Sequence, residues 1–516
     1  MGIFLTLMLL LSLSPVVHAL PLDYDEELTA QVKLQYDTVI DVLPLDDMRA
    51  AIGGVWQHGL NPTQYWTADM EKTYMKGPDQ RVKMKKRVNQ NFLRLLSDIS
   101  VGSVDPEALT GDIKFKRKKF LTPQQLQTVI VSTGQKADLL IESLAPQNSP
   151  YVSLRTTLLK IYPACSNGQW APIGKTKKVL KLGVKDPAVP SIKSRLMFMG
   201  YAISSPDDTF DQESVNAIND IEWNLHLKPD SAVHPSGKVT KFLNVSCLDR
   251  VRQLQADMEK MRWFPSQFED RYIFINLAMT YFVMVDKTQN PAYITSFRTI
   301  NGRAERKSPT MKDKIVRVIL NPSWIVPPTI FIEDKVTEIR NLPRYQIKYY
   351  FDSHNYEVWN KDMSRRLDPT TIDWWSFDAS LDADIYIRQK PNYWNALGVI
   401  KFELTNSFSV YLHDTNQREL FWEPQRLLSS GCIRLEKPFD LAEYLLKGTA
   451  WDRAKIEAST LKPGEVADKS IKIDLTNPMP VYTAFLTSFL SSDNIIRFTD
   501  DIYGQNTDIL SSMKAL

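Results

Sequence analysis

Apolar positions recur with two different periods along this 516-residue chain. In the first third they recur every three or four residues, as at Phe92, Leu96 and Ile99, which predicts helices with one buried face. In the second half, short β-branched and aromatic runs predominate, as in 272–276 and 316–320, and predict strands. The chain is therefore expected to be a multidomain α+β protein, with helices first and a mostly β region after them.

One stretch of the β region, 408–435, combines strand patterns with reactive side chains. Apolar and polar residues alternate from Phe408 to Leu412, which predicts a strand with His413 at its end, beside Tyr411 on the polar face. A second short strand is predicted at 433–435, directly after the run Ser429-Ser430-Gly431-Cys432. In that strand Cys432 and Arg434 share one face.

A cysteine behind a glycine, with a histidine 19 residues upstream, is a candidate nucleophile and base. The thiolate is the reactive form of cysteine, and a neighbouring imidazole can take the thiol proton. Gly431 permits a sharp turn that exposes the sulfur, and backbone N–H groups near Gly431 and Cys432 could stabilise an oxyanion. The alternative is that Cys432 is a buried small apolar residue and His413 a surface residue. The residues alone leave both interpretations open.

The residues of this motif resemble a known family signature. His413-Asp414-Thr415, followed by Ser429-Ser430-Gly431-Cys432-Ile433-Arg434, resembles the catalytic motif of the L,D-transpeptidases with a YkuD-type domain. That motif is a histidine, a spacer and Ser/Thr-x-Gly-Cys-x-Arg. Many members have histidine where this chain has Ser430, a departure that is usual in the large multidomain YcbB-like subgroup. The resemblance extends to 321–328, 395–398 and 500–504.

The resemblance implies roles for the motif residues. Cys432 is the expected nucleophile and His413 the expected base, with oxyanion donors on the backbone of Ser430, Gly431 and Cys432. Tyr411 and Trp324 are expected to line the pocket, although Trp324 in a proline-flanked run is also typical of core packing. Arg434 is expected either to support the site or substrate or to make a structural ion pair.

The resemblance also implies a reaction. Cys432 would attack the amide after the third residue of a peptidoglycan stem tetrapeptide, D-alanine would leave, and a second stem amine would take the acyl group to give a 3–3 cross-link. No cofactor and no metal are expected, and carbapenem β-lactams are expected inhibitors. Two other classes remain open: a carboxypeptidase or cross-link hydrolase that uses the same thioester, and a non-catalytic wall-binding scaffold.

The pattern and the resemblance together divide the chain. The expected parts are a signal peptide at 1–19, a helical scaffold at 20–170, a peptidoglycan-binding-like module at 171–245, a linking amphipathic helix of the scaffold within 246–268, and the catalytic domain at 269–516 with an insert at about 329–391. The module resembles a small three-helix wall-binding fold, but two expected glycines are absent from 224–231. The insert is rich in aromatic residues and is expected either to cap the active site or to be an excursion packed by its own aromatics; both can be true.

Charge distribution and histidine spacing limit the partners and metals that the chain is expected to bind. The chain has 63 basic and 60 acidic residues and no dense basic stripe, which argues against nucleic acid. The basic run 114–120 is expected to be a solvated face, with contact to an anionic wall polymer or membrane surface as the alternative. His226 and His234 are eight residues apart, a spacing that matches no usual metal-ligand pattern.

The N-terminus predicts export. Residues 1–19 have an apolar core and end in Val17-His18-Ala19, which indicates a cleaved signal peptide and a periplasmic protein; an uncleaved anchor is the alternative. Export permits disulfides. If Cys432 is the nucleophile, Cys165 and Cys247 are left over, and they bracket the module. They are expected to be either bridged or two buried thiols.

Overall fold

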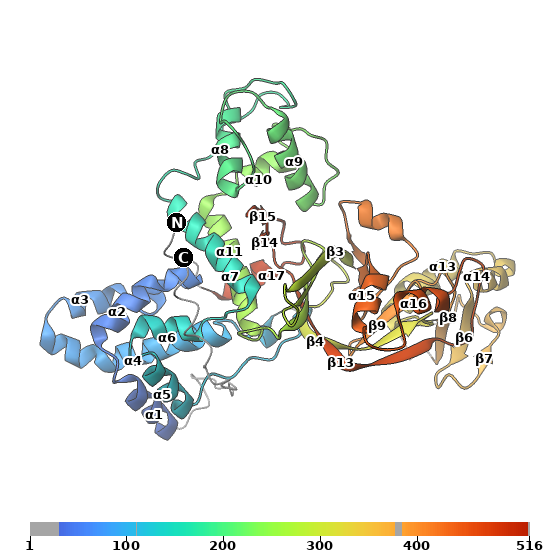
Figure 1. The fold of residues 1–516 in the computed structure, drawn as a ribbon, viewed down its shortest axis with the longest axis horizontal. Helices are drawn as coiled ribbons and strands as arrows, with labels where there is room; N and C mark the ends of the chain where they lie inside the picture. The colour runs from blue at the N-terminus through green and yellow to red at the C-terminus, as the bar shows by residue number, and fades with distance from the viewer. Residues whose placement is uncertain (1–29, 110, 377–383, 514–516) are drawn as a thin grey trace.

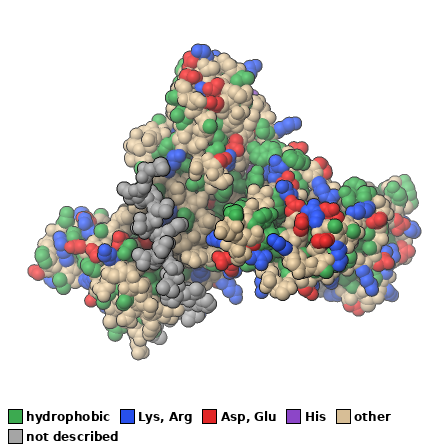
Figure 2. Space-filling model, in the orientation of Figure 1, with side chains coloured by type: hydrophobic (Ala, Val, Ile, Leu, Met, Phe, Trp, Pro, Cys, Tyr) green, Lys and Arg blue, Asp and Glu red, His purple; other side chains and the backbone are tan. Residues whose placement is uncertain are grey.

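The computed structural model describes residues 30–109, 111–376 and 384–513, so the expected signal peptide at 1–19 lies outside the described residues. Helices and strands form lobes that meet around α11 (Cys247–Trp263), with the N-terminal helices at the lower left and the β-rich part at the right of Figure 1. Basic and acidic side chains are intermingled over the β-rich lobe in Figure 2. No helix in the described ranges is long and apolar enough to cross a membrane.

The N-terminal lobe is helical, as predicted. Its helices are α1 (Ala30–Ile40), α2 (Leu45–Gly54), α3 (Ala68–Tyr74), α4 (Pro78–Val101), α5 (Pro123–Ser132), α6 (Ala137–Leu144) and α7 (Ser149–Ala164). The three apolar positions that predicted α4, Phe92, Leu96 and Ile99, are all fully buried. Side-chain caps fix where helices begin: Thr122 and Gln125 form a capping box at the start of α5.

The segment after α7 forms a second group of helices, α8 (Val189–Met199), α9 (Gln212–Asn224) and α10 (Lys238–Leu243), at the top of Figure 1. Gly200 ends α8 with a φ of +102°, and a Cβ there would lie 2.4 Å from the carbonyl oxygen of Asn494. This close approach packs the group against the hairpin of β14 (Ser488–Leu490) and β15 (Ile496–Phe498). Cys165 and Cys247, which bracket the group, are joined in a disulfide.

Helix α11 differs from its prediction as an amphipathic helix. Every residue from Leu254 to Trp263 is buried, including four charged side chains. These charges are paired within the helix, Asp257 with Lys260 at 3.0 Å and Glu259 with Arg262 at 2.6 Å. A buried charge is tolerated when it is paired and hydrogen-bonded, so these four charged positions do not mark a solvent-facing side.

The basic run 114–120 also differs from its prediction. It lies against the β-rich lobe: the N–H of Lys114 donates to the carbonyl of Thr310 at 2.8 Å. Phe115 packs edge-on against Phe264, and Phe120 is buried. Only part of the run is therefore a solvated face, because its aromatic residues anchor it to the core.

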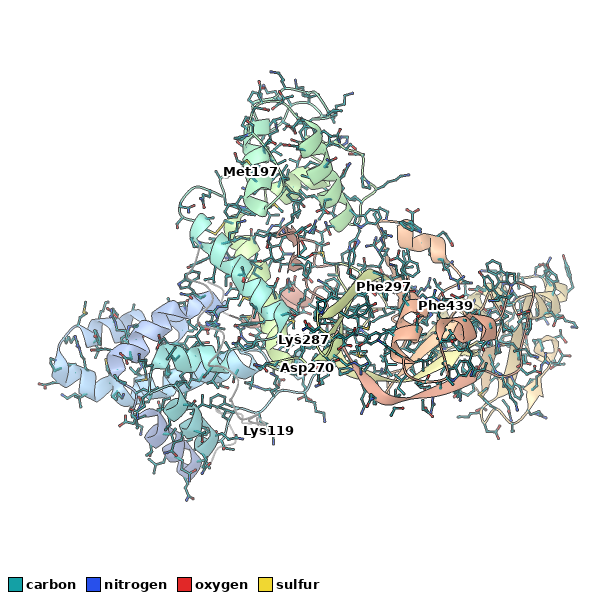
Figure 3. All side chains as sticks on the ribbon, in the orientation of Figure 1. Lys119, Met197, Asp270, Lys287, Phe297 and Phe439 are labelled. Atoms are coloured by element: carbon teal, nitrogen blue, oxygen red, sulfur yellow. A yellow bond between two sulfur atoms is a disulfide. The ribbon has the colours of Figure 1, made fainter. Side chains whose placement is uncertain are left out.

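The β-rich lobe is built on a nine-stranded sheet with the order β11-β3-β12-β10-β9-β4-β13-β1-β2. Its strands are β1 (Arg271–Asn276), β2 (Tyr281–Asp286), β3 (Tyr293–Gly302), β4 (Met311–Leu320), β9 (Ile400–Leu404), β10 (Leu412–His413), β11 (Leu427–Ser429), β12 (Ile433–Leu435) and β13 (Ile471–Ala484). A further pairing of β2 with β3 closes the sheet into a barrel. The inward apolar side chains form one core, which includes Phe297, and Phe439 of α15 (Pro438–Leu445) packs against it (Figure 3).

The expected strand from Phe408 to Leu412 is much shorter than predicted. Only Leu412 and His413 pair, as β10, because Ser409 has a φ of +58° that breaks the extended run. The lobe is completed by α16 (Arg453–Ser459) and α17 (Gln505–Ser512).

The insert forms a second, four-stranded sheet at the far right of Figure 1. Its elements are β5 (Trp324–Ile325), α12 (Pro328–Ile330), α13 (Val336–Arg340), α14 (Ile347–Ser353), β6 (Tyr356–Asn360), β7 (Arg366–Leu367) and β8 (Ile385–Gln389). It has an aromatic core of its own around the fully buried Trp374, and Leu397 and Tyr411 pack against that core. The insert thus contacts the strand end that carries His413.

Candidate active site

The candidate residues lie on the outer face of the barrel, where β9, β10 and β12 run side by side. Leu412 pairs with Phe402 and Ile433, and all three point into the barrel core. The next residue, His413, therefore points outward, because successive side chains on a strand alternate between faces. Cys432 precedes β12 by one residue and faces outward with Tyr411, whose carbonyl accepts a hydrogen bond from the N–H of Ile433 at 3.1 Å.

The thiol of Cys432 is half-buried among polar groups. Its sulfur lies 3.6 Å from the carbonyl oxygen of Ser409. Burial raises the pKa of the thiol, while the backbone and hydroxyl of Tyr411 and the cations Lys401 and Arg434 act in the opposite direction. Burial dominates, so the resting group is a neutral thiol that needs a base.

The imidazole of His413 is only 4% exposed. Burial, and then the charge of Arg434, lower the pKa of His413 to about 3, although the backbone of Asp414 and Leu397 favours the charged ring. Nδ1 makes no hydrogen bond of good geometry to any described residue. No hydrogen bond joins His413 to Cys432 in the described part of the chain either; such contacts often tighten only when substrate binds. His413 is thus a neutral imidazole that can accept a proton.

Asp414 anchors the strand end that carries His413. Its carboxylate accepts a hydrogen bond from the N–H of Val399 at 2.9 Å and a salt bridge from Arg418, so it is turned away from the imidazole. Gly398 makes room for it: a Cβ on Gly398 would lie 2.3 Å from Oδ2 of Asp414, and the φ of Gly398 is +61°. The glycine at the end of the run 395–398 is therefore explained by its packing against Asp414, which the sequence did not reveal.

We expect Gly398→Ala to destabilise the protein by about 3 kcal/mol, because it adds a steric clash to left-handed backbone strain. Gly448→Ala is the matched control, since Gly448 has a φ of +82° but nothing within 4 Å of its would-be Cβ. Thermal or denaturant unfolding of both variants measures the difference. Equal losses in the two variants would mean that the contact with Asp414 does not matter.

The loop 429–432 has fewer available oxyanion donors than predicted. Gly431 adopts a φ of +113°, and its N–H is already bound to Oγ of Ser429 at 3.1 Å. The N–H groups of Ser430 and Cys432 donate no hydrogen bond within the described ranges. The expectation that the whole loop supplies donors is therefore wrong for Gly431, and the N–H groups of Ser430 and Cys432 remain as candidates.

Comparison with known families shows what this barrel is similar to. Residues 270–457 match the model of the YkuD L,D-transpeptidase catalytic domain, and residues 44–158 match a scaffold domain. This part of the chain is similar to an L,D-transpeptidase catalytic domain. It follows a helical scaffold domain, as the sequence predicted.

Individual relatives agree over part of the chain. A Haemophilus influenzae protein named "Putative L,D-transpeptidase" is 33% identical over 216 residues, which are 42% of this chain and 41% of that protein. The chain thus spans about two fifths of the length of that relative.

Two solved structures align with the chain at low similarity. An L,D-transpeptidase from Xylanimonas cellulosilytica covers 60% of this chain with 12% identity and a TM-score of 0.20. A fused Zn-dependent amidase/peptidase/peptidoglycan-binding domain-containing protein from Clostridium acetobutylicum also covers 60%, with 11% identity and a TM-score of 0.15. Both alignments span 100% of the solved chain, but scores this low carry no argument.

Within the barrel a second loop, 302–308, supports the cysteine loop. Oγ of Ser308 donates to the carbonyl of Gly431 at 2.7 Å, and Arg306 donates to Oγ of Ser430 at 3.0 Å. Arg306 also forms salt bridges with Glu333 and Asp334 at the start of the insert. Sequence reasoning did not find these residues, because they are more than 120 positions from Ser430 and Gly431, which they bind, and carry no pattern of their own.

The remaining candidate residues, and His226 of the module, have mixed outcomes. Trp324 is buried in the insert core, in which Tyr411 also packs, so the core-packing interpretation describes its environment. Arg434 donates to Oε1 of Gln417 at 2.9 Å and makes no ion pair with any described residue, which contradicts the structural ion pair. His226 lies between the carbonyls of Pro424 and Ala278, far from a metal-site geometry, and the described residues hold no metal-ligating cluster of histidine, cysteine and acidic side chains.

Proposed function

We propose that this chain is a periplasmic L,D-transpeptidase that forms 3–3 cross-links between peptidoglycan stem peptides. The observation that carries the proposal is the shared outward face of β10 and β12, where His413 and Cys432 lie beside the unengaged N–H groups of the loop 429–432. The proposal needs no cofactor. Periplasmic location follows from the N-terminal signal pattern alone.

In the proposed first half-reaction, His413 takes the proton of the Cys432 thiol while the sulfur attacks the carbonyl carbon of the third stem residue. The N–H groups of Ser430 and Cys432 stabilise the oxyanion that forms. When the tetrahedral intermediate collapses, the C–N bond breaks, the amine of D-alanine takes the proton from His413, and a thioester remains on Cys432.

In the proposed second half-reaction, the side-chain amine of another stem attacks the thioester. His413 accepts a proton from that amine and returns one to the departing Cys432 sulfur. The insert favours this outcome over hydrolysis, because its aromatic core extends to Tyr411 beside the thiol and limits water there. A hydrolase would share every step up to the thioester, so the acceptor separates the two classes.

The first test is intact mass of the purified protein after incubation with a carbapenem. We expect one covalent adduct per chain that maps to the peptide containing Cys432, because ring opening traps the same acyl-enzyme. A protein that forms no adduct and also leaves a tetrapeptide stem unchanged would contradict the proposal and favour a non-catalytic wall-binding scaffold. Pull-down on insoluble peptidoglycan would then measure binding alone.

A further inference from the structure

Strand pairing places His413 between two cations on the outer face of the barrel. On one side its pairing partner is Lys401 of β9, and on the other side it is Arg434 of β12. The same row continues from Lys401 through Ile319 of β4 to Lys472 of β13. Directly paired residues point to the same face of a sheet, so these side chains share the face of the proposed active site.

Lys401 belongs to no motif, yet it lies against Tyr411, the neighbour of the nucleophile. Its Nζ is 3.9 Å from the centroid of the Tyr411 ring, and Tyr411 in turn contacts the sulfur of Cys432. A cation over an aromatic face is attracted by the ring, so this contact fixes both side chains. Lys401 is half-buried, and burial lowers the pKa of its ammonium group.

The charge of Lys401 is not neutralised by a direct partner. No hydrogen bond and no salt bridge to the ammonium group of Lys401 occurs among the described residues. Glu403, two positions along the same strand face, is engaged instead by Arg317 at 2.8 Å. The other charged or titratable groups that face this point are Arg434, His413, Tyr411 and Lys472. The net charge around the thiol is therefore positive, which favours a thiolate and disfavours an imidazolium.

We propose that Lys401 is a positioning residue that holds Tyr411 against Cys432 and stabilises the thiolate of Cys432 with its ammonium charge. The inference rests on the proposed function only for the use made of that thiolate. The step is a proton transfer: the S–H bond of Cys432 breaks, an N–H bond forms on His413, and the electron pair stays on sulfur. Lys401 keeps its own protons throughout.

Alkylation by iodoacetamide tests this inference without any substrate. Cys432 is the only free cysteine, because Cys165 and Cys247 are bridged, so the mass of the alkylated chain reports Cys432 alone. The rate of alkylation against pH gives the midpoint of thiolate formation. We expect Lys401→Met and Lys401→Gln to raise this midpoint by about one pH unit, which is about tenfold slower alkylation below the midpoint.

Two controls separate charge from packing. Lys401→Arg keeps the charge and should leave the midpoint near that of the wild type. Lys472→Met removes one positive charge from the same face, two strands away from Lys401, and should shift the midpoint far less than Lys401→Met does. Circular dichroism confirms that each variant is folded before alkylation is measured.

An unchanged midpoint in folded Lys401→Met and Lys401→Gln overturns the inference, even if the enzyme processes stem peptides. A shifted midpoint in a protein that never turns over a stem leaves the inference standing and contradicts the proposed function. A shift of equal size in Lys472→Met would also overturn it, because the effect would then be one of general surface charge.

Discussion

Replacing Cys432 with alanine is expected to lower product formation from a tetrapeptide stem by at least about 10⁴-fold, because no thioester can form. The thiol is half-buried and its sulfur lies 3.6 Å from the carbonyl oxygen of Ser409, a long contact, so the fold should be kept. Chromatography of the reaction products measures the loss, and the thermal midpoint checks the fold.

Cys432→Ser is the matched control for shape. Its hydroxyl is a far weaker nucleophile at neutral pH, so it should be nearly as inactive as the alanine variant. An alanine variant that releases D-alanine at the wild-type rate would rule out Cys432 as the nucleophile.

Replacing His413 with glutamine is expected to lower the acylation rate by about 10³-fold, because general base catalysis by a positioned side chain contributes on this order. Glutamine is close to imidazole in size and polarity but cannot take up the thiol proton. The rate of carbapenem adduct formation, followed by intact mass, measures the effect. His234→Gln is the control, since His234 is exposed and lies between α9 and α10, outside the barrel, and it should react like the wild type.

The same variant has an expected effect on stability against pH. Folded His413 has a pKa of about 3 against an ordinary value of 6.5, so the unfolded chain binds a proton in this window that the folded chain does not. Wild-type stability must therefore fall as pH falls from 6.5 toward 3, by up to about 1.4 kcal/mol per pH unit from this group. His413→Gln should lose less stability over that window. Parallel stability curves would mean that His413 is not held neutral by the fold.

The periodicity of apolar residues predicted helices and strands correctly where burial against one core alone determines which positions are apolar. It located the N-terminal helices and the long strands because their apolar residues face one core each. It failed at α11, whose charges are paired inside the protein, and at Phe408–Leu412, where Ser409 turns the backbone. Both failures come from tertiary contacts that make a local pattern misleading.

The residues of the candidate site also fall into those that the sequence could predict and those that it could not. A cysteine behind a glycine and a histidine at a strand end made Cys432 and His413 candidates, and the resemblance to the L,D-transpeptidase motif implied their roles. Lys401 and Arg306 could not be predicted, because a lone cation in a strand or loop has no pattern until pairing brings it beside the motif. Gly398 is a further case, since its role depends on the carboxylate of Asp414 packed against it.

The most direct test of the central claim is product analysis of the full chain incubated with a muropeptide that carries a tetrapeptide stem. The account predicts release of D-alanine together with a dimer in which two third residues are joined, as read by tandem mass spectrometry. Formation of tripeptide without any dimer, at every concentration of acceptor stem, would contradict cross-linking and assign the thioester to hydrolysis.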